Sequence, residues 1–148
     1  MRAASGARWE RGQSTVFFAS FVVILAVLTA VVLEVGRLAY ARGEVAKAAD
    51  AAALAAASRV DIAQYRDTGQ ILFLPDVNAY AQGFASANSA YLTSRSIPVL
   101  VSGIRLDDST RVVAVSVTAD LSPLLPSLLQ GGGVVTVTGY AQARLDGR

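Results

Sequence analysis

The run VFFASFVVILAVLTAVVL, residues 16–33, decides the fold of this chain. It is 18 residues long, and the uncharged stretch around it extends from Gly12 to Leu33. Crossing a bilayer takes about 20 apolar residues, and a helix buried in a soluble core rarely needs so unbroken a run. We therefore predict a membrane-spanning helix over residues 13–33, after a short tail of residues 1–12.

The sequence that follows this run keeps a helical character. No proline occurs before Pro75, and Glu44 and Lys47 stand three residues apart, where opposite charges meet on one helix surface. Nine of the twelve residues from 46 to 57 are alanine, the strongest helix former. We expect the membrane helix to continue without a break through residues 34–58.

A secretory signal peptide is the alternative interpretation of this region. Arg2, Arg8 and Arg11 supply a basic n-region, and the triplet AYA at residues 39–41 fits the small-residue cleavage rule. The apolar run is longer than the roughly 7 to 15 residues usual in signal peptides, and the helical pattern persists beyond it. Both features favour a retained helix.

The orientation of the helix follows from the lengths of the two flanks. Lysines and arginines near the two ends of the run are equal in number, so the charge bias does not decide it. The short tail before the run and the long segment after it favour a cytoplasmic tail. We expect a single-pass membrane protein, with residues 59–148 forming a small extracytoplasmic domain.

That domain is expected to contain one further long helix. Residues 74–94 carry apolar side chains at helical spacing, and Asp76 after Pro75 is suited to cap the helix. The apolar stripe, interpreted as core, consists of Val77, Tyr80, Ala81, Phe84 and Tyr91.

The pattern then changes to the period of two that is typical of strands. We predict strands over residues 97–106, 110–121 and 134–145, with a bulge near Gly103 and a hairpin loop at Asp107–Thr110. Residues 122–133 read as a short helix that a glycine run ends. The fold class is α+β, with a long N-terminal helix followed by an antiparallel sheet.

The alanine-rich helix segment raises the question of what it packs against. One face of the last strand also consists of small residues, so helix and sheet could approach closely along a seam. We assign to this helix–sheet seam Val45, Ala49, Ala52, Ala56 and Val60. On the opposite helix face we expect Glu44, Lys47, Asp50, Ala51, Leu54 and Ser58. The alternative, that the alanines only favour helix formation, stays open.

The composition argues against catalysis. The chain has no cysteine and no histidine, which removes disulfides, thiolate zinc sites and the usual general base. Lys47, the only lysine, is expected to pair with acidic neighbours on a solvated face. Asp107 and Asp108 are explained by a turn better than by calcium, which needs more oxygens. We expect no enzyme activity, cofactor, metal or small-molecule substrate, and without a basic stripe no nucleic acid.

Two stretches resemble a known family. These are RGQSTVFF (residues 11–18) and EVGRLAYARGEVAKAADAAALAAA (residues 34–57). The chain is similar in them to the TadE/TadG-like proteins of Flp (Tad) pilus assembly. The resemblance implies a bacterial envelope protein of the cytoplasmic (inner) membrane with a pilin-like domain, built like a minor pilin or pseudopilin. Its implied partners are the lipid bilayer and other Tad pilus or pilin-like subunits, within pilus assembly or its secretion apparatus.

The sequence departs from the family pattern near the expected processing site. The resemblance implies a candidate prepilin-peptidase site between Gly12 and Gln13, with a glutamate five residues after the glycine. Phe17 occupies that position. This favours a retained assembly component over a cleaved major subunit, while entry into a filament or the assembly platform stays open. The alternative function is a stand-alone envelope domain, anchored or released by signal cleavage, that binds a ligand.

Overall fold

The computed structural model describes residues 6–123 and 133–145 of the chain. These residues belong to two compact units that divide between Arg37 and Leu38. One helix, α1 (Gly6–Ala57), runs through that division. The unbroken helix expected over residues 13–58 is therefore present, and it begins earlier than expected and ends at Ala57.

In the first unit, two hydroxyl groups within the apolar run are satisfied by the helix itself. The hydroxyl of Ser20 donates to the carbonyl of Val16 at 2.9 Å. The hydroxyl of Thr29 donates to the carbonyl of Leu25 at 2.8 Å. Internal pairing of this kind is what a lipid environment requires, because lipid offers no hydrogen-bond partner.

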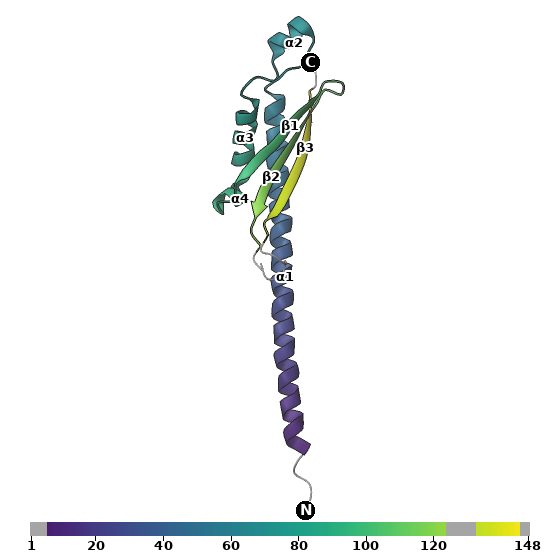
Figure 1. Cartoon of the computed structure of the whole chain (residues 1–148), viewed down its shortest axis with the longest axis vertical. Coiled ribbons are helices and arrows are strands. Elements are labelled where there is room, and N and C mark those ends of the chain that lie inside the picture. Colours follow the sequence, from purple (N-terminus) through teal and green to yellow (C-terminus); the bar gives the residue numbers. More distant parts are fainter. Residues whose placement is uncertain (1–5, 124–132, 146–148) are drawn as a thin grey trace, which may run out of the picture. The chain divides into compact units, whose positions relative to one another are not determined.

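The second unit is built on a three-stranded antiparallel sheet (Figure 1). Its strands are β1 (Val99–Asp107), β2 (Val112–Leu121) and β3 (Val135–Arg144), in the spatial order β1-β2-β3. All three strands were expected from the period-two pattern. The α+β fold class, a long helix followed by a small antiparallel sheet, is thereby confirmed.

The central strand β2 fixes the register of the sheet. Its pairing with β3 is unbroken from Val112 opposite Arg144 to Leu121 opposite Val135. A slip of one residue would turn the buried side chains of β2 to the outer face of the sheet, so burial fixes this register. The buried side chains are Val113, Val115, Val117, Ala119 and Leu121, the face expected from the sequence.

The bulge expected near Gly103 is confirmed. The register between β1 and β2 shifts between Val101 and Gly103. The hairpin loop that joins the two strands is held by Asp107, whose carboxylate accepts hydrogen bonds from the N–H groups of Ser109 and Thr110. The turn interpretation of the two aspartates is therefore correct for Asp107.

The helices of the domain differ from the expected pattern. A short helix that was not expected, α2 (Ile62–Thr68), is capped by Asp61, which accepts from the Gln64 N–H, and ends at Gly69 with φ 72°. The single helix expected over residues 74–94 is two helices. These are α3 (Val77–Ala87) and α4 (Ala90–Ser94).

The prediction for Asp76 was wrong in its chemistry. Asp76 occupies the N-cap position of α3, but its side chain makes no capping hydrogen bond. Its carboxylate instead lies 3.2 Å from the guanidinium of Arg59. The short helix expected over residues 122–133 lies largely outside the described residues.

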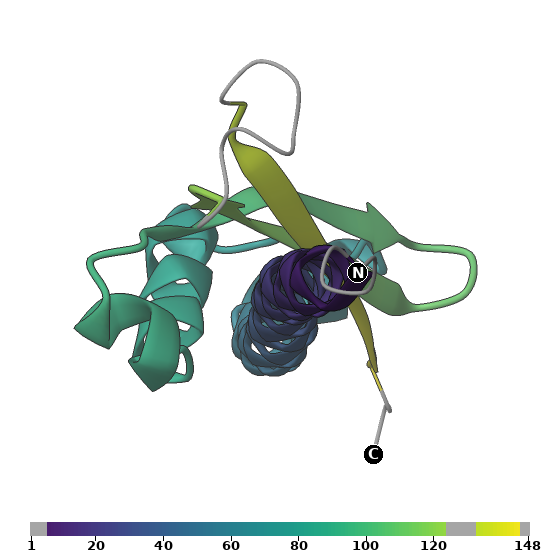
Figure 2. The same ribbon diagram turned by 90° about the horizontal axis from the view of Figure 1, so that it is seen from below.

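The core of the second unit lies between the sheet and the helices. Figure 2 shows that α3 and the part of α1 in this unit lie on the same side of the sheet. Leu92 of α4 and Val113 and Val117 of β2 have no exposed surface. Burying a large aliphatic side chain contributes about 1.5–3 kcal/mol, so a few such residues matter in a core otherwise rich in alanine.

Candidate functional site

The apolar surface of α1 in the first unit is the first candidate site. Phe17, Phe21 and Val32 are 68%, 61% and 69% exposed. The most apolar window of α1 is not buried at all, and α1 is the only helix among the described residues long and apolar enough to cross a membrane. A soluble core helix would bury this surface, so that alternative does not describe this segment.

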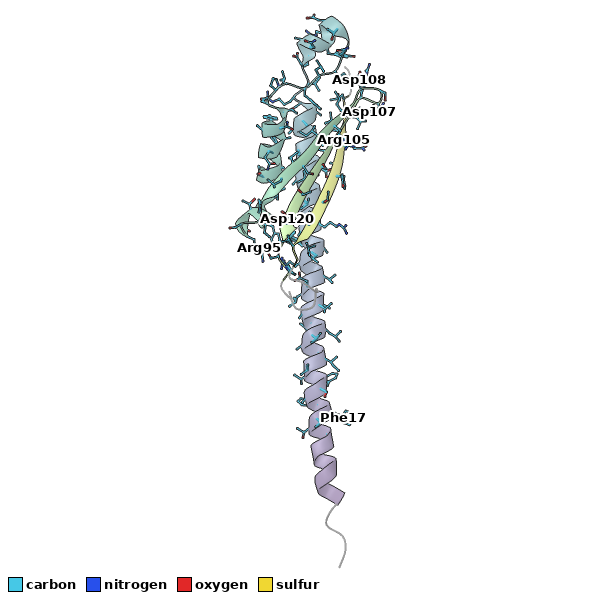
Figure 3. The ribbon with its side chains drawn as sticks, viewed as in Figure 1. Phe17, Arg95, Arg105, Asp107, Asp108 and Asp120 are labelled. Atoms are coloured by element: carbon cyan, nitrogen blue, oxygen red, sulfur yellow. The ribbon has the colours of Figure 1, made fainter. Side chains whose placement is uncertain are left out.

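The candidate processing site lies in the same helix. The backbone at Gly12 and Gln13 is helical, and their side chains lie outside the described part of the chain. Phe17 follows on α1 (Figure 3). Phe17 is the second residue of the apolar run of residues 16–33, so an apolar side chain extends that run where the resemblance implies a glutamate.

The second candidate site is the alanine-rich face of α1 against β3. Val45, Ala49, Ala52 and Ala56 have no exposed surface. A Cβ atom added at Gly139 of β3 would lie 2.7 Å from the Val45 carbonyl oxygen and 3.0 Å from its carbonyl carbon. Helix and strand backbones therefore come almost into contact at this point, which only small residues permit.

The buried face of the helix is wider than the five residues assigned to the seam. Also buried are Ala41, Ala48, Ala53 and Ala55. The remaining seam residue, Val60, lies beyond the end of α1. It is partly buried and forms an isolated antiparallel bridge with Phe73. The structure thus brings four of the five assigned residues to one helix face and places Val60 elsewhere.

The charged face of the helix contains one exception to the expected pattern. Glu44 is only 6% exposed, so the expectation that it faces solvent was wrong. Its carboxylate accepts a hydrogen bond from the Lys47 ammonium at 3.0 Å. That bond and the charge of Glu44 raise the pKa of Lys47 above its ordinary value. The only lysine is thus a protonated ion-pair partner, which is not the state in which a lysine acts as nucleophile.

A shallow apolar groove runs between α1 and α3. Phe84 is 43% exposed there, so the stripe that was expected to be core is only partly buried. Its ring lies 4.9 Å from that of Tyr80, and the guanidinium of Arg59 lies 4.0 Å above Tyr80. The groove is lined by Ala51, Leu54, Ala55, Ser58, Tyr80, Phe84 and Asn88.

The carboxylates of the domain do not form a metal site within the described residues. Figure 3 places Asp107 and Asp108 together at the tip of the β1–β2 hairpin, and Asp120 near the other end of the sheet. In residues 6–123 and 133–145, no three acidic side chains lie close enough to hold an ion. Hydrogen bonds from Ser109 and Thr110 lower the pKa of Asp107. This carboxylate therefore already accepts hydrogen bonds within its own turn.

The structural role of one polar residue was not predicted from the sequence. Gln82 of α3 donates from its amide nitrogen to the Val99 carbonyl at 2.7 Å. Its amide oxygen accepts from the Val101 N–H at 2.8 Å. The side chain therefore pairs with the outer edge of β1 as a neighbouring strand would. A glutamine on a predicted helix gives no signal of this role, because its partners lie far along the chain.

Comparison with known proteins points to one family. No curated protein sequence and no solved structure matches the chain. Residues 12–59 match the family model of the Flp pilus-assembly TadE/G-like proteins. The matched range covers the unburied apolar run and the alanine-rich face. The resemblance seen in the sequence is thereby confirmed: residues 12–59 of this chain are similar to the Flp pilus-assembly TadE/G-like family.

Proposed function

We propose that this protein is a membrane-anchored, non-catalytic component of Tad/Flp pilus assembly or its secretion apparatus, of the minor pilin or pseudopilin type. The observation that carries the proposal is the family match over residues 12–59. That range begins in the helix ahead of the apolar run and ends just beyond α1, so the match covers the parts that would meet lipid and the sheet.

The two parts of the helix suit two different tasks. The uncharged run exposes apolar side chains over its whole length, as a lipid-facing anchor does. The part after Leu38 is instead buried under the sheet through alanines, so the helix itself is a core element of the domain. One helix that supplies both an apolar anchor and part of a domain core suits a membrane-anchored assembly component.

Several features support a role without catalysis. The only lysine is engaged by Glu44, and Asp107 by its own turn. The side chains of Lys47 and Asp107 therefore both take part in local structure. Partner binding instead requires surface, and the domain presents exposed apolar side chains such as Leu54 and Phe84. The proposed partners are other Tad pilus or pilin-like subunits and the lipid bilayer.

Removing the protein from its native cells is expected to abolish most piliation, because the assembly step that needs this component is then left undone. Pili are counted by electron microscopy. Expression of the full chain from a plasmid is expected to restore the count, and the same vector without the gene serves as the control. Normal piliation in cells lacking the protein would rule out an assembly role and favour a stand-alone envelope domain.

The position of the chain in the membrane is tested by its protected fragment. We expect protease added to intact spheroplasts to remove residues 59–148 and leave a fragment that starts before Gly12. The uncharged run should keep the helix in the membrane, where protease cannot reach it. Phe17 replaces the glutamate that the resemblance implies, so cleavage after Gly12 is not expected. The measurement is the mass of the fragment recovered from washed membranes.

Three other results would each contradict part of this proposal. A fragment that starts at Gln13 shows cleavage by a prepilin peptidase and moves the protein towards the processed pilins. A mature protein that starts at Arg42 and is released from membranes shows a signal peptide. A chain that is cut only after the spheroplasts are lysed has the opposite orientation.

A further inference from the structure

The second unit carries a shallow hollow on the outer face of its sheet. Figure 2 shows α1 and α3 on the inner face, toward which the buried side chains of β2 point, such as Val113 and Val117. The hollow is bordered by side chains that alternate with these and therefore project the other way. Its volume is about 440 Å³. Small-molecule sites in proteins occupy about 300–1,000 Å³, so the hollow has room for one small ligand or one unit of a longer one.

The floor of the hollow consists of small side chains. Ala114 and Ser116 are successive outward residues of β2, and Gly103 of β1 lies opposite Ser116. The hydroxyl of Ser102, the extra residue at the bulge, donates to the Ser116 hydroxyl at 3.0 Å. The Ser116 hydroxyl donates in turn to the Gly103 carbonyl at 3.4 Å. The hydroxyls of the floor are therefore paired with neighbouring groups, which holds the floor in place.

Three larger side chains border this floor from the two outer strands. Arg105 of β1 and Gln142 of β3 lie on opposite sides of Ala114. Tyr140 of β3 lies opposite Ser116. Residues directly opposite in an antiparallel pair project from the same face of the sheet. The Cα atoms of Arg105 and Gln142 are thus about 10 Å apart, or two strand spacings, and Tyr140 follows about 7 Å along β3.

These three bordering groups are uncommitted in the part of the chain that the structure describes. The side chains of Arg105, Tyr140 and Gln142 take part there in no hydrogen bond or ion pair. Tyr140 is 79% exposed. One exposed aromatic residue is ordinary on a protein surface. Here, however, a guanidinium, an aromatic ring and an amide border one hollow, and each is available to a ligand.

The guanidinium of Arg105 gives the hollow a positive charge (Figure 3). The acidic residue nearest along the strand, Asp107, accepts hydrogen bonds from the Ser109 hydroxyl at 2.6 Å and from the Thr110 N–H. Its carboxylate therefore serves the hairpin turn and forms no ion pair with Arg105. The planar fork of an arginine can donate two parallel hydrogen bonds to one carboxylate. The ligand that complements this charge carries a carboxylate.

The other two groups narrow the choice of ligand. A tyrosine ring offers a flat apolar surface, against which the C–H face of a sugar ring can pack. The amide of Gln142 both donates and accepts hydrogen bonds, as neighbouring sugar hydroxyls do. An apolar side chain of a peptide would cover Tyr140 but leave the amide of Gln142 without a partner, which is unfavourable.

We propose that this hollow binds a carboxylate-bearing sugar residue of a glycan. Arg105 holds the carboxylate, Tyr140 packs against the sugar ring, and Gln142 pairs with its hydroxyls. A glycan is chosen over a free sugar because all three side chains are exposed and the hollow is shallow, so a chain can enter and leave it. Every residue of the site belongs to the second unit, so the proposal does not depend on the membrane anchor.

The test uses the purified full chain, isotopically labelled, in micelles of an amine-oxide detergent, which contains neither sugar nor phosphate. The probe is methyl β-D-glucuronide, which has a carboxylate and a substituted anomeric carbon, as a residue within a glycan has. The neutral control is methyl β-D-glucoside. Free glucuronate represents a free sugar, and N-acetylphenylalanine represents a peptide carboxylate with an aromatic ring and no sugar hydroxyls.

The readout is the NMR chemical shift of the Arg105 Nε–H group, the Gln142 side-chain amide and the Tyr140 ring. For a ligand of about 14 non-hydrogen atoms, such as the glucuronide, we expect a Kd on the order of 1 mM. The glucoside is expected to bind at least roughly tenfold more weakly, because it cannot accept the charge-assisted hydrogen bonds of Arg105. Free glucuronate is expected to bind no more tightly than its methyl glycoside.

A pair of arginine variants tests the origin of this preference. Arg105→Gln removes the charge but keeps a hydrogen-bond donor, and is expected to bring the two methyl glycosides to roughly equal affinity. The control is Arg111→Gln, which removes the same charge from an exposed position outside the hollow. It is expected to keep the tenfold difference. If Arg105→Gln does not fold, the comparison of the ligands on the unaltered protein still decides the question.

A second pair tests the packing of the sugar ring. Tyr140→Ala is expected to weaken binding of the glucuronide at least roughly tenfold, since loss of a stacking surface is typically of this size. Tyr140→Phe keeps the ring and is expected to retain most of the affinity. Equal binding by both variants would show that the ring takes no part, and the proposed arrangement would be wrong.

Four results with the unaltered protein would overturn the proposal. Equal affinity for the glucuronide and the glucoside would exclude recognition of the carboxylate, and no shifts with either would exclude a saccharide site. Tighter binding of N-acetylphenylalanine would make a peptide the occupant, and tighter binding of free glucuronate would make it a free sugar. Because the experiment involves no pili, its failure leaves the proposed function standing, and loss of the assembly role leaves this site to be tested.

Discussion

Replacing Gly139 with alanine is expected to lower the free energy of unfolding by about 1–3 kcal/mol, the usual effect of adding bulk to a packed contact. The added Cβ would lie 2.7 Å from the Val45 carbonyl oxygen and 3.0 Å from both its carbonyl carbon and its Cγ1 atom. Two of these three atoms belong to the backbone of α1, which cannot rotate away as a side chain can. Helix and strand must therefore separate.

The measurement is thermal unfolding of the full chain in detergent, followed by the near-ultraviolet signal of the tyrosines. In a protein of about 150 residues, each kcal/mol corresponds to a shift of roughly 2–4 °C in Tm. The matched control is Gly83→Ala in α3, where an added Cβ meets nothing within 4 Å. Alanine is favoured over glycine inside a helix by about 0.8–1.0 kcal/mol, so the control is expected to raise Tm.

The two glycine variants distinguish a steric clash in the folded protein from the entropic effect of alanine on the unfolded chain. Both changes add one methyl group and both restrict the unfolded chain, which by itself stabilises a protein. Opposite shifts of Tm therefore isolate the contact with Val45. If Gly139→Ala is as stable as the unaltered protein, α1 and β3 do not meet as closely as the structure has them.

The parts of the fold that could be predicted from the sequence are those with a strong local period. The uncharged run and the alternation Val113, Val115, Val117 each repeat a simple pattern over many residues, and helix and strand followed from them. The bulge was predictable because Gly103 interrupts an otherwise regular alternation. These signals are local, so one sequence was enough to read them.

The parts that were not predicted depend on contacts between distant residues. The break between α3 and α4 falls at Asn88 and Ser89, where no glycine or proline marks it. Ser89 is buried and its hydroxyl donates to the Ser86 carbonyl. The pairing of Gln82 with β1 joins residues 17 and 19 positions apart, and nothing in the helix pattern indicates it.

Helix α2 is a different case, because its signal was present in the sequence. Asp61 stands three residues before Gln64, and Gly69 follows the last turn, as expected of a capped helix with a left-handed end. The burial of Glu44 could not be predicted from the sequence for a different reason. A helical wheel assigns a face from the helix alone, and cannot show that the buried face is widened by other elements.

Substituting leucine for Ala49 or Ala52 is expected to destabilise the domain by about 1–3 kcal/mol each. Both residues have no exposed surface and lie on the helix face that packs under the sheet. The surrounding core is closely packed, so three additional carbon atoms force neighbouring side chains out of their preferred rotamers. The two sites are three residues apart on one helix, so their effects in a double variant need not add.

The control for these substitutions is Ala46→Leu, at an exposed position of the same helix. Surface changes usually alter stability by less than about 0.5 kcal/mol. Leucine is close to alanine in helix propensity, so all three variants should behave alike if the alanines only favour the helix. Thermal unfolding of the full chain in detergent measures the difference. A low Tm for Ala49→Leu and Ala52→Leu beside an unchanged Ala46→Leu would show that the alanines are required by the closeness of the sheet. Equal Tm values for all three would leave helix propensity as their only role.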